Sequence, residues 1–342
     1  MVDRPDAAPE GYSTRRPVSP GAEELLGLYF PVLDHGFVAL VDYMGTDACI
    51  ERAARVSYGY GTRKAQLTRG LLRYLRRHMH TTPSEMVEFK FHCCMPMFIA
   101  RQWIRHRTAS VNEYSGRYSL MPMLFYTPNA DQLQTQSKRN NQGRSGDAVT
   151  LAKYQEAVRR WNEIRERSRG AYEWMTNEEI ARELARIDLP LSTYTQWYWK
   201  IDLHNLLHFL KLRVDAHAQW EIQEFGRVMA GMLKRVAPHS YEAWIDYDVC
   251  GARVSRMELD VLRKLIKTGE GTLEPRAGAS ALGLGELESA GLAKREIREL
   301  FDKLQNVEVP DFELDLSQAQ SAESFAERFA RAVPKVDKAP TE

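Results

Sequence analysis

The sequence predicts a protein of the α/β class, in which strands alternate with helices along the chain. Short runs rich in Val, Phe and Trp alternate apolar and polar residues, which is the period of a half-buried strand. Longer segments between them carry Leu, Ile and Ala at helical spacing. No apolar run in the sequence approaches the roughly 18 residues that a transmembrane helix needs.

Three segments have the strand pattern: Gly36–Met44, Met86–Cys94 and Ser192–Ile201. Pro96 follows the second segment and is expected to stop it, because proline donates no ladder hydrogen bond. These segments are the predicted sheet.

The remaining periodic segments predict helices, and in Met97–Arg107 the pair Ile99 and Trp103 lies one turn apart on an apolar face. Thr108–Tyr118 is polar and small, which favours a loop. The predicted helices are Thr46–Tyr58, Ala65–His78, Met97–Arg107, Thr150–Trp174, Glu178–Ile187, Leu203–Val214 and His217–Val236.

The 342 residues divide by composition into a polar, Pro-rich leader (1–30, predicted disordered), a main domain (31–250) and an extension (251–342). The extension contains four Phe and no Trp, Tyr, His or Cys. It predicts a linker over Gly269–Gly285 and helices over Ser289–Leu304 and Ala322–Ala332. Asp131–Asp147 in the main domain is polar and predicts a flexible connection or lid.

Lys and Arg number 47 and Asp and Glu number 46, so the formal net charge is +1. A near-neutral chain is not expected to bind nucleic acid or a membrane surface through its overall charge. The four cysteines form no CxxC pair, which favours reduced thiols in a cytoplasmic protein.

A local basic cluster stands out against this balance, because Arg101–Tyr118 contains four Arg and one Glu. Cations are favoured at the end of a helix, which accounts for Arg105–Arg107 without any function. The hydroxyl, amide and glycine residues that follow are suited to binding a phosphate or a heterocycle. Gln102, Arg105 and His106 are expected on one helical face.

A second cluster lies in Leu203–Val214, where Arg213 falls at the edge of the apolar stripe. An arginine beside the core needs a partner, which is either an internal carboxylate or an anionic ligand. His204 and His208 lie one turn apart on the opposite side. A His-x-x-x-His pair can bind metal, but the sequence offers no clear third ligand, so no metal site is predicted.

Arg105-His106-Arg107, seven residues and then Ser115 together resemble the signature of the flavin-dependent thymidylate synthases, the ThyX family. Other blocks resemble the same family in the same order, across Gly36 to Asp248. These blocks are His80–Glu85, Ala100–Trp103, Asn112–Tyr118, Ala185–Pro190 and Leu212–Glu221.

The resemblance implies reductive methylation of dUMP to dTMP, with 5,10-methylenetetrahydrofolate as carbon donor and NADPH-reduced FAD as hydride donor. It implies no cysteine nucleophile and a homotetramer with active sites at subunit interfaces. The implied fold is a central, mainly antiparallel sheet flanked by helices, an α+β arrangement, followed here by a mostly helical extension. Neither nucleic acid nor a membrane is expected as a partner.

The resemblance also implies residue roles, with Arg213 as the catalytic residue that polarises the uracil ring, favours ionisation at N3 and so activates C5. The residues implied for dUMP are Gln102, Trp103, Ile104, Arg105, Glu113, Tyr114, Ser115, Gly116, Arg117, Arg186 and Arg213. The residues implied for FAD are His80, Thr82, Arg105, His106, Arg107, Glu113, Asp202, Leu203, His204 and His208.

The chain departs from the family pattern at Asp202-Leu203-His204, where many members have Asn-x-Arg. The alternative hypothesis is a non-catalytic protein that binds nucleotides or single-stranded nucleic acid through the basic cluster. The segment 132–147 and the extension have no assigned role.

Overall fold

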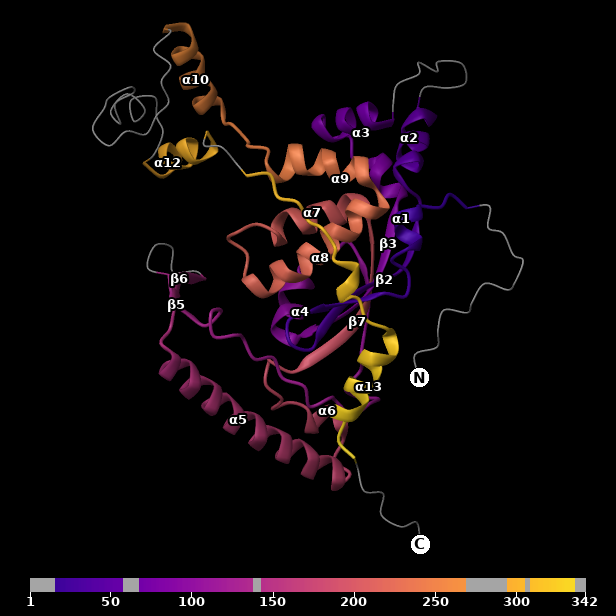
Figure 1. The fold of residues 1–342 in the computed structure, drawn as a ribbon, viewed down its shortest axis with the longest axis vertical. Helices are drawn as coiled ribbons and strands as arrows, with labels where there is room; N and C mark the ends of the chain where they lie inside the picture. The colour runs from indigo at the N-terminus through magenta and orange to yellow at the C-terminus, as the bar shows by residue number, and fades with distance from the viewer. Residues whose placement is uncertain (1–15, 58–67, 138–142, 269–293, 305–307, 336–342) are drawn as a thin grey trace. The chain divides into compact units, whose positions relative to one another are not determined.

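The computed structural model describes residues 16–57, 68–137, 143–268, 294–304 and 308–335 (Figure 1). The chain forms two compact units: residues 1–242 together with 312–342, and residues 243–311. The predicted α/β fold class is confirmed. The predicted boundaries of the leader, main domain and extension stay predictions.

The larger unit is built on a five-stranded antiparallel sheet in the order β1-β2-β3-β7-β4. The three predicted strands are present within two residues of their expected bounds. The strands are β1 (Tyr29–Val32), β2 (Gly36–Met44), β3 (Glu88–Pro96), β4 (Ser110–Glu113) and β7 (Tyr194–Asp202).

One face of the sheet carries a layer of large aromatic side chains. Trp103 is fully buried there, with ring centroids 5.2 Å from Trp199 and 4.9 Å from Phe209. Trp197 and Phe225 complete the layer at 5.5 and 5.8 Å from Trp103. Trp197 and Trp199 come from β7, and the other three residues come from α4 (Met97–Trp103), α7 (Leu203–Arg213) and α8 (Trp220–Val236).

The opposite face is covered by α13 (Ala322–Ala332), which coincides with the predicted helix. The chain reaches it through η3 (Leu316–Gln318), and Gln320 and Tyr29 exchange backbone hydrogen bonds of 2.8 and 3.0 Å. Phe325 then packs against Phe37 at 4.8 Å between ring centroids. The last part of the extension is therefore integral to the larger unit.

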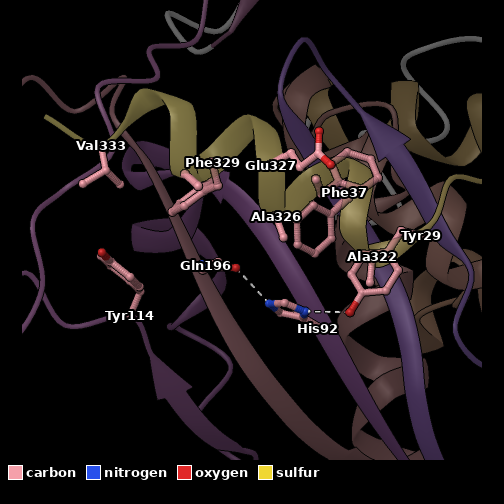
Figure 2. Close-up of a pocket in the computed structure, with 12 residues that line it drawn as sticks. Tyr29, Phe37, His92, Tyr114, Gln196, Ala322, Ala326, Glu327, Phe329 and Val333 are labelled. Atoms are coloured by element: carbon pink, nitrogen blue, oxygen red, sulfur yellow. Dashed lines mark hydrogen bonds between the residues drawn. The ribbon is translucent and has the colours of Figure 1, made fainter. Parts of the chain in front are cut away.

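A cavity of about 520 Å³ lies between α13 and this face of the sheet (Figure 2). Its polar floor is His92, whose two ring nitrogens bond Tyr29 Oη at 3.1 Å and Gln196 Oε1 at 3.0 Å. Burial lowers the pKa of His92 to about 4, so the imidazole is neutral. The cavity is on the face of the sheet opposite Trp103.

The described part of the predicted leader is ordered, which corrects the expectation of disorder up to residue 30. Pro20–Glu23 form α1, and Ala22 and Leu25 are fully buried. Ser19 Oγ also donates to the carbonyl oxygen of Val236 at 3.1 Å. Apolar side chains in this stretch supply the packing that a polar leader would lack.

Three further local predictions need correction. The helix predicted over Met97–Arg107 ends at Trp103, and the predicted loop Thr108–Tyr118 contains β4. Within Glu178–Ile187 only α6 (Arg182–Ala185) is helical, and Glu179 has a φ of 57°. The exposed edge strand β4 has no apolar alternation by which sequence could reveal it.

The remaining predicted helices agree with the structure where they are described. Asp131–Asp147, predicted as a flexible connection or lid, takes part in a small antiparallel pair of β5 (Gln134–Gln136) and β6 (Arg144–Ala148). The remaining predicted helices are α2 (Asp47–Val56), α3 (Thr68–Arg77) and α5 (Leu151–Asn177), whereas η1 (Thr82–Met86) and α9 (Pro238–Trp244) were not predicted.

The smaller unit holds η2 (Ile245–Val249), α10 (Arg256–Thr268) and α12 (Lys294–Lys303). Val261, Ile297 and Leu300 form its buried cluster. The linker predicted over Gly269–Gly285 lies outside the described residues. Within the described parts of the chain, no helix is both long and apolar enough to cross a membrane.

We predict that Phe325→Ala destabilises the larger unit by about 3 kcal/mol, because it empties a packed aromatic site. Urea unfolding followed by circular dichroism measures the change. Glu327→Ala on the same helix is the control, since it removes only an exposed ion pair with Arg331. Equal stability of the two variants would contradict the packing role of Phe325.

Candidate functional site

The basic signature follows directly after the aromatic layer. α4 ends at Trp103, and the amide N–H of His106 donates to the carbonyl oxygen of Trp103 at 3.0 Å. Arg105 and Arg107 are exposed in this turn. Trp103 itself is buried in the core, so its side chain supports the turn and does not face a ligand.

Arg213 approaches this turn from the end of α7. Its Nε donates to His106 Nε2 at 3.1 Å. Burial lowers the pKa of Arg213, and the nearby positive charge of Arg105 lowers it further. The structure therefore brings Arg213, at the end of α7, beside Arg105 and His106, which are more than 100 residues earlier in the sequence.

His106 is held in its neutral form. Its pKa is lowered to about 4 by burial first, then by the charges of Arg213 and His208. The partner of Arg213 in the described part of the chain is thus an uncharged imidazole. The sequence alone had left two alternatives for this partner, an internal carboxylate or an anionic ligand. Two neighbouring guanidinium groups beside a neutral base form a site for an anion.

The loop Glu113–Arg117 crosses the edge of the sheet. Glu113 Oε1 accepts a hydrogen bond from Thr195 Oγ1 at 2.7 Å, and the Tyr114 amide donates to the Gln196 carbonyl oxygen at 2.8 Å. Ser115 Oγ accepts from the amide of Arg117 at 3.3 Å. Side-chain and backbone hydrogen bonds to β7 therefore hold the start of the loop in place.

Gly116 lies against Arg186, and both residues belong to the predicted dUMP set. A β-carbon at Gly116 would lie 3.0 Å from Arg186 Cδ and 2.7 Å from Met121 Sδ, so only glycine fits without displacement. Arg117 forms an exposed ion pair with Glu183, just before Arg186. The structure thus forms a second basic cluster from Ser115, Gly116, Arg117 and Arg186.

The start of α7 carries the predicted cofactor residues. Asp202 caps the helix, accepting from the Asn205 amide at 2.9 Å, and Leu203 is fully buried. Nδ1 of His204 is a buried atom without a hydrogen-bond partner in the described structure. His208 is exposed, and its ring lies 5.9 Å from that of His106.

The other two predicted cofactor residues lie near the same end of α7. His80 follows α3, and Thr82 begins η1. The last residue before β3, Val87, accepts a hydrogen bond from the Leu203 amide at 2.7 Å. The His80 ring stacks with Tyr74 at 6.0 Å between centroids.

Sequence reasoning did not assign Gln219 or Glu221 to the site. Gln102 Nε2 donates to Gln219 Oε1, and Gln219 Nε2 donates to Glu221 Oε2 at 2.9 Å. Glu221 is 2% exposed. The signal in the sequence was an acidic residue in the first turn of an apolar helix, which also suits an ordinary helix start.

Comparison with known proteins places this geometry in a family. Residues 39–239 match the family model described as thymidylate synthase complementing protein, Thy1. Because the match covers more than half of the chain, the chain belongs to this family.

Two curated relatives are both named flavin-dependent thymidylate synthase. The protein from Rickettsia bellii is 45% identical over 303 residues, covering 84% of this chain and 97% of its own length. The protein from Ruegeria pomeroyi is 49% identical over 272 residues, covering 78% of this chain and 89% of its own length. The alignment with the Rickettsia bellii protein covers more residues of this chain than the 250 that precede the extension, so it includes part of the extension as well.

A solved structure also resembles this chain. The UMP/dUMP methylase PolB from Streptomyces cacaoi, bound with 5-Br dUMP, has a TM-score of 0.58 and 32% sequence identity. The match covers 64% of this chain and 98% of that protein.

We predict that the His106 ring titrates near pH 4 instead of near 6.5. Between these values the unfolded chain binds a proton that the folded protein does not, so stability falls as the pH drops through this window. NMR of the imidazole measures the midpoint. Arg213→Gln should raise it by removing a neighbouring positive charge, and a midpoint near 6.5 in the unmodified protein would contradict the assignment.

Proposed function

We propose that this protein is a flavin-dependent thymidylate synthase that converts dUMP to dTMP. The carbon comes from 5,10-methylenetetrahydrofolate, and NADPH reduces the flavin. The observation that carries the proposal is the pairing of Arg105 and Arg213 beside neutral His106, in a chain of this family. The site holds two positive charges and, among the described residues, no negative partner for Arg213, and an anionic pyrimidine nucleotide supplies that negative charge.

Arg213 is the catalytic residue in this proposal. His106 occupies its Nε, which leaves the two terminal nitrogens of the guanidinium for the uracil ring. A positive charge in a partly buried position stabilises negative charge that develops on the ring. Ionisation at N3 is favoured in this way, and C5 becomes the nucleophilic carbon.

The phosphate of dUMP is assigned to the cluster of Ser115, Gly116, Arg117 and Arg186. The close approach of Gly116 to Arg186 supports this, because a hydroxyl, backbone amides and guanidinium groups then lie within one small region. Arginine binds phosphate through two parallel hydrogen bonds, which fixes its orientation. Glu113 and Tyr114 hold the loop to β7.

FAD is the proposed cofactor, and the residues around α7 fit it. The unpartnered Nδ1 of His204 needs a hydrogen-bond partner, which a polar cofactor atom provides. His80, Thr82, His106 and His208 would line the cofactor, while Arg105 and Arg107 meet its phosphates. When bound, the reduced flavin supplies the hydride that completes the methyl group.

Cysteine chemistry is not required by the proposed reaction. Cys93 and Cys94 are fully buried in β3, and burial raises the pKa of both thiols. A thiol held in its neutral form is a poor nucleophile. This supports activation of the ring by Arg213 instead of by a covalent adduct.

The proposed assembly is a cytoplasmic homotetramer with active sites shared between subunits. This proposal rests on the family of the chain, because the exposed apolar residues of α5, Leu151, Ile164 and Trp174, lie on different sides of that helix and form no single face. A shared site would join residues of the two basic clusters from different protomers.

We predict that Arg213→Met lowers kcat/KM for dUMP by about 100-fold or more, because charge stabilisation at the ring is lost. The kcat/KM of Arg213→Lys should lie between those of the unmodified enzyme and Arg213→Met, because lysine keeps the positive charge but lacks the planar guanidinium group. The measurement is tritium release from 5-tritiated dUMP with NADPH and methylenetetrahydrofolate under anaerobic conditions.

Arg160→Ala, which removes an exposed ion pair with Glu156 on α5, is the matched control and should behave like the unmodified enzyme. The purified protein should be yellow. Flavin-loaded, unmodified protein that released no tritium would refute the proposed function.

A further inference from the structure

The polar hairpin of β5 and β6 reaches the site region through one arginine. Gly143 precedes Arg144 with a φ of 66°, a conformation that favours glycine. Arg144 Nη2 donates to Glu221 Oε1 in the first turn of α8, and Nη1 donates to Gln132 Oε1 at 2.9 Å. The hairpin is thereby anchored beside α4 and α8.

Glu221 receives hydrogen bonds on both carboxylate oxygens. Oε1 accepts from Arg144 and from the Tyr126 hydroxyl at 3.0 Å, and Oε2 accepts from Gln219 Nε2 at 2.9 Å. The N-terminus of α8 also favours a negative charge at this position. Glu221 is therefore a buried carboxylate whose hydrogen bonds are satisfied.

The carboxylate fixes the direction of a chain of side-chain amides. Because a carboxylate only accepts, Gln219 must turn its Nε2 toward Glu221. Its Oε1 then faces Gln102, which donates from Nε2. The end of the Gln102 amide that faces away from Gln219 is its oxygen, Oε1, so this end offers a ligand an acceptor, and Gln219 takes one of the two N–H groups of Nε2.

We propose that Arg144 and Glu221 are positioning residues that present Gln102 to the bound nucleotide as a hydrogen-bond acceptor. This rests on the proposed function, in which Gln102 binds dUMP. The nucleotide carries a donor that matches, the 3′-hydroxyl of its sugar. The hairpin thus contributes to nucleotide affinity without touching the nucleotide.

Glu221→Gln reverses the chain of amides while conserving its shape. Arg144 and Tyr126 both donate, so they hold the new amide oxygen, and the amide nitrogen faces Gln219. Gln219 then turns its oxygen to residue 221 and its nitrogen to Gln102, which must present a donor to the nucleotide. We expect KM for dUMP to rise about tenfold, with kcat changed much less.

A second substitution distinguishes this reversal from general damage. Gln102→Glu alone places a carboxylate against the oxygen of Gln219 and should weaken dUMP binding. In the Glu221→Gln background, Gln219 presents a nitrogen instead, so the carboxylate accepts from it and keeps an acceptor for the nucleotide. Glu221→Gln should therefore improve dUMP binding in the Gln102→Glu enzyme, although it weakens binding in the unmodified enzyme.

The anchoring arginine is tested separately. Arg144→Met should raise KM for dUMP by about tenfold, and Arg144→Lys should restore part of the loss. Arg160→Ala is the control, because it removes an arginine from an exposed ion pair of α5. Thermal unfolding of the flavin-loaded enzymes verifies that each variant folds.

KM is measured by tritium release, and dUMP affinity by the change in flavin absorbance. The proposal fails if Glu221→Gln and Arg144→Met keep the KM of an active, unmodified enzyme. It also fails if Glu221→Gln weakens dUMP binding in the Gln102→Glu enzyme as it does in the unmodified one. Failure of the proposed function is recognised differently, because the unmodified enzyme would then form no dTMP.

Discussion

The packing of Trp103 against the sheet is the constraint on which the site depends. Its indole contacts Trp197 and Trp199 of β7, Phe209 of α7 and Phe225 of α8. The end of α4 is thereby fixed relative to three other elements. Since Arg105 and His106 lie in the turn that follows Trp103, the aromatic layer places them beside Arg213, which ends α7.

The site formed in this way is electrostatically costly for the protein alone. Arg213 is half-buried beside a second guanidinium and bonded to an uncharged imidazole, and its pKa is lowered. An internal carboxylate would stabilise the fold more, but it would repel an anionic nucleotide. A ligand that supplies the missing charge stabilises the folded state by its own binding free energy.

The sequence predicts the parts of this structure whose signal is local. Strong apolar alternation located β2, β3 and β7, and helical spacing located α7 and α13. β4 was not predicted because an exposed edge strand has no buried face to alternate. The helix expected over Glu178–Ile187 is shorter because helical propensity alone does not outweigh the turn at Glu179.

The site could likewise be predicted only where its signal is local. The sequence shows that Arg213 lies at the edge of an apolar stripe and that it needs a partner. The identity of that partner could not be predicted, because His106 is 107 residues away and meets it only through the aromatic layer. Gln219 and Glu221 were missed for the same reason, since their significance lies in a contact with Gln102, 117 residues away from Gln219.

The loop that carries Ser115 connects the two faces of the sheet. Glu113 accepts a hydrogen bond from Thr195 on the face that carries Trp103, while the Tyr114 ring packs against Phe329 of α13 on the opposite face, with ring centroids 5.9 Å apart. Consecutive residues of an extended chain point to opposite faces, so one edge segment contacts both layers. The end of the extension therefore supports, through Phe329, the same loop that the β7 hydrogen bonds support.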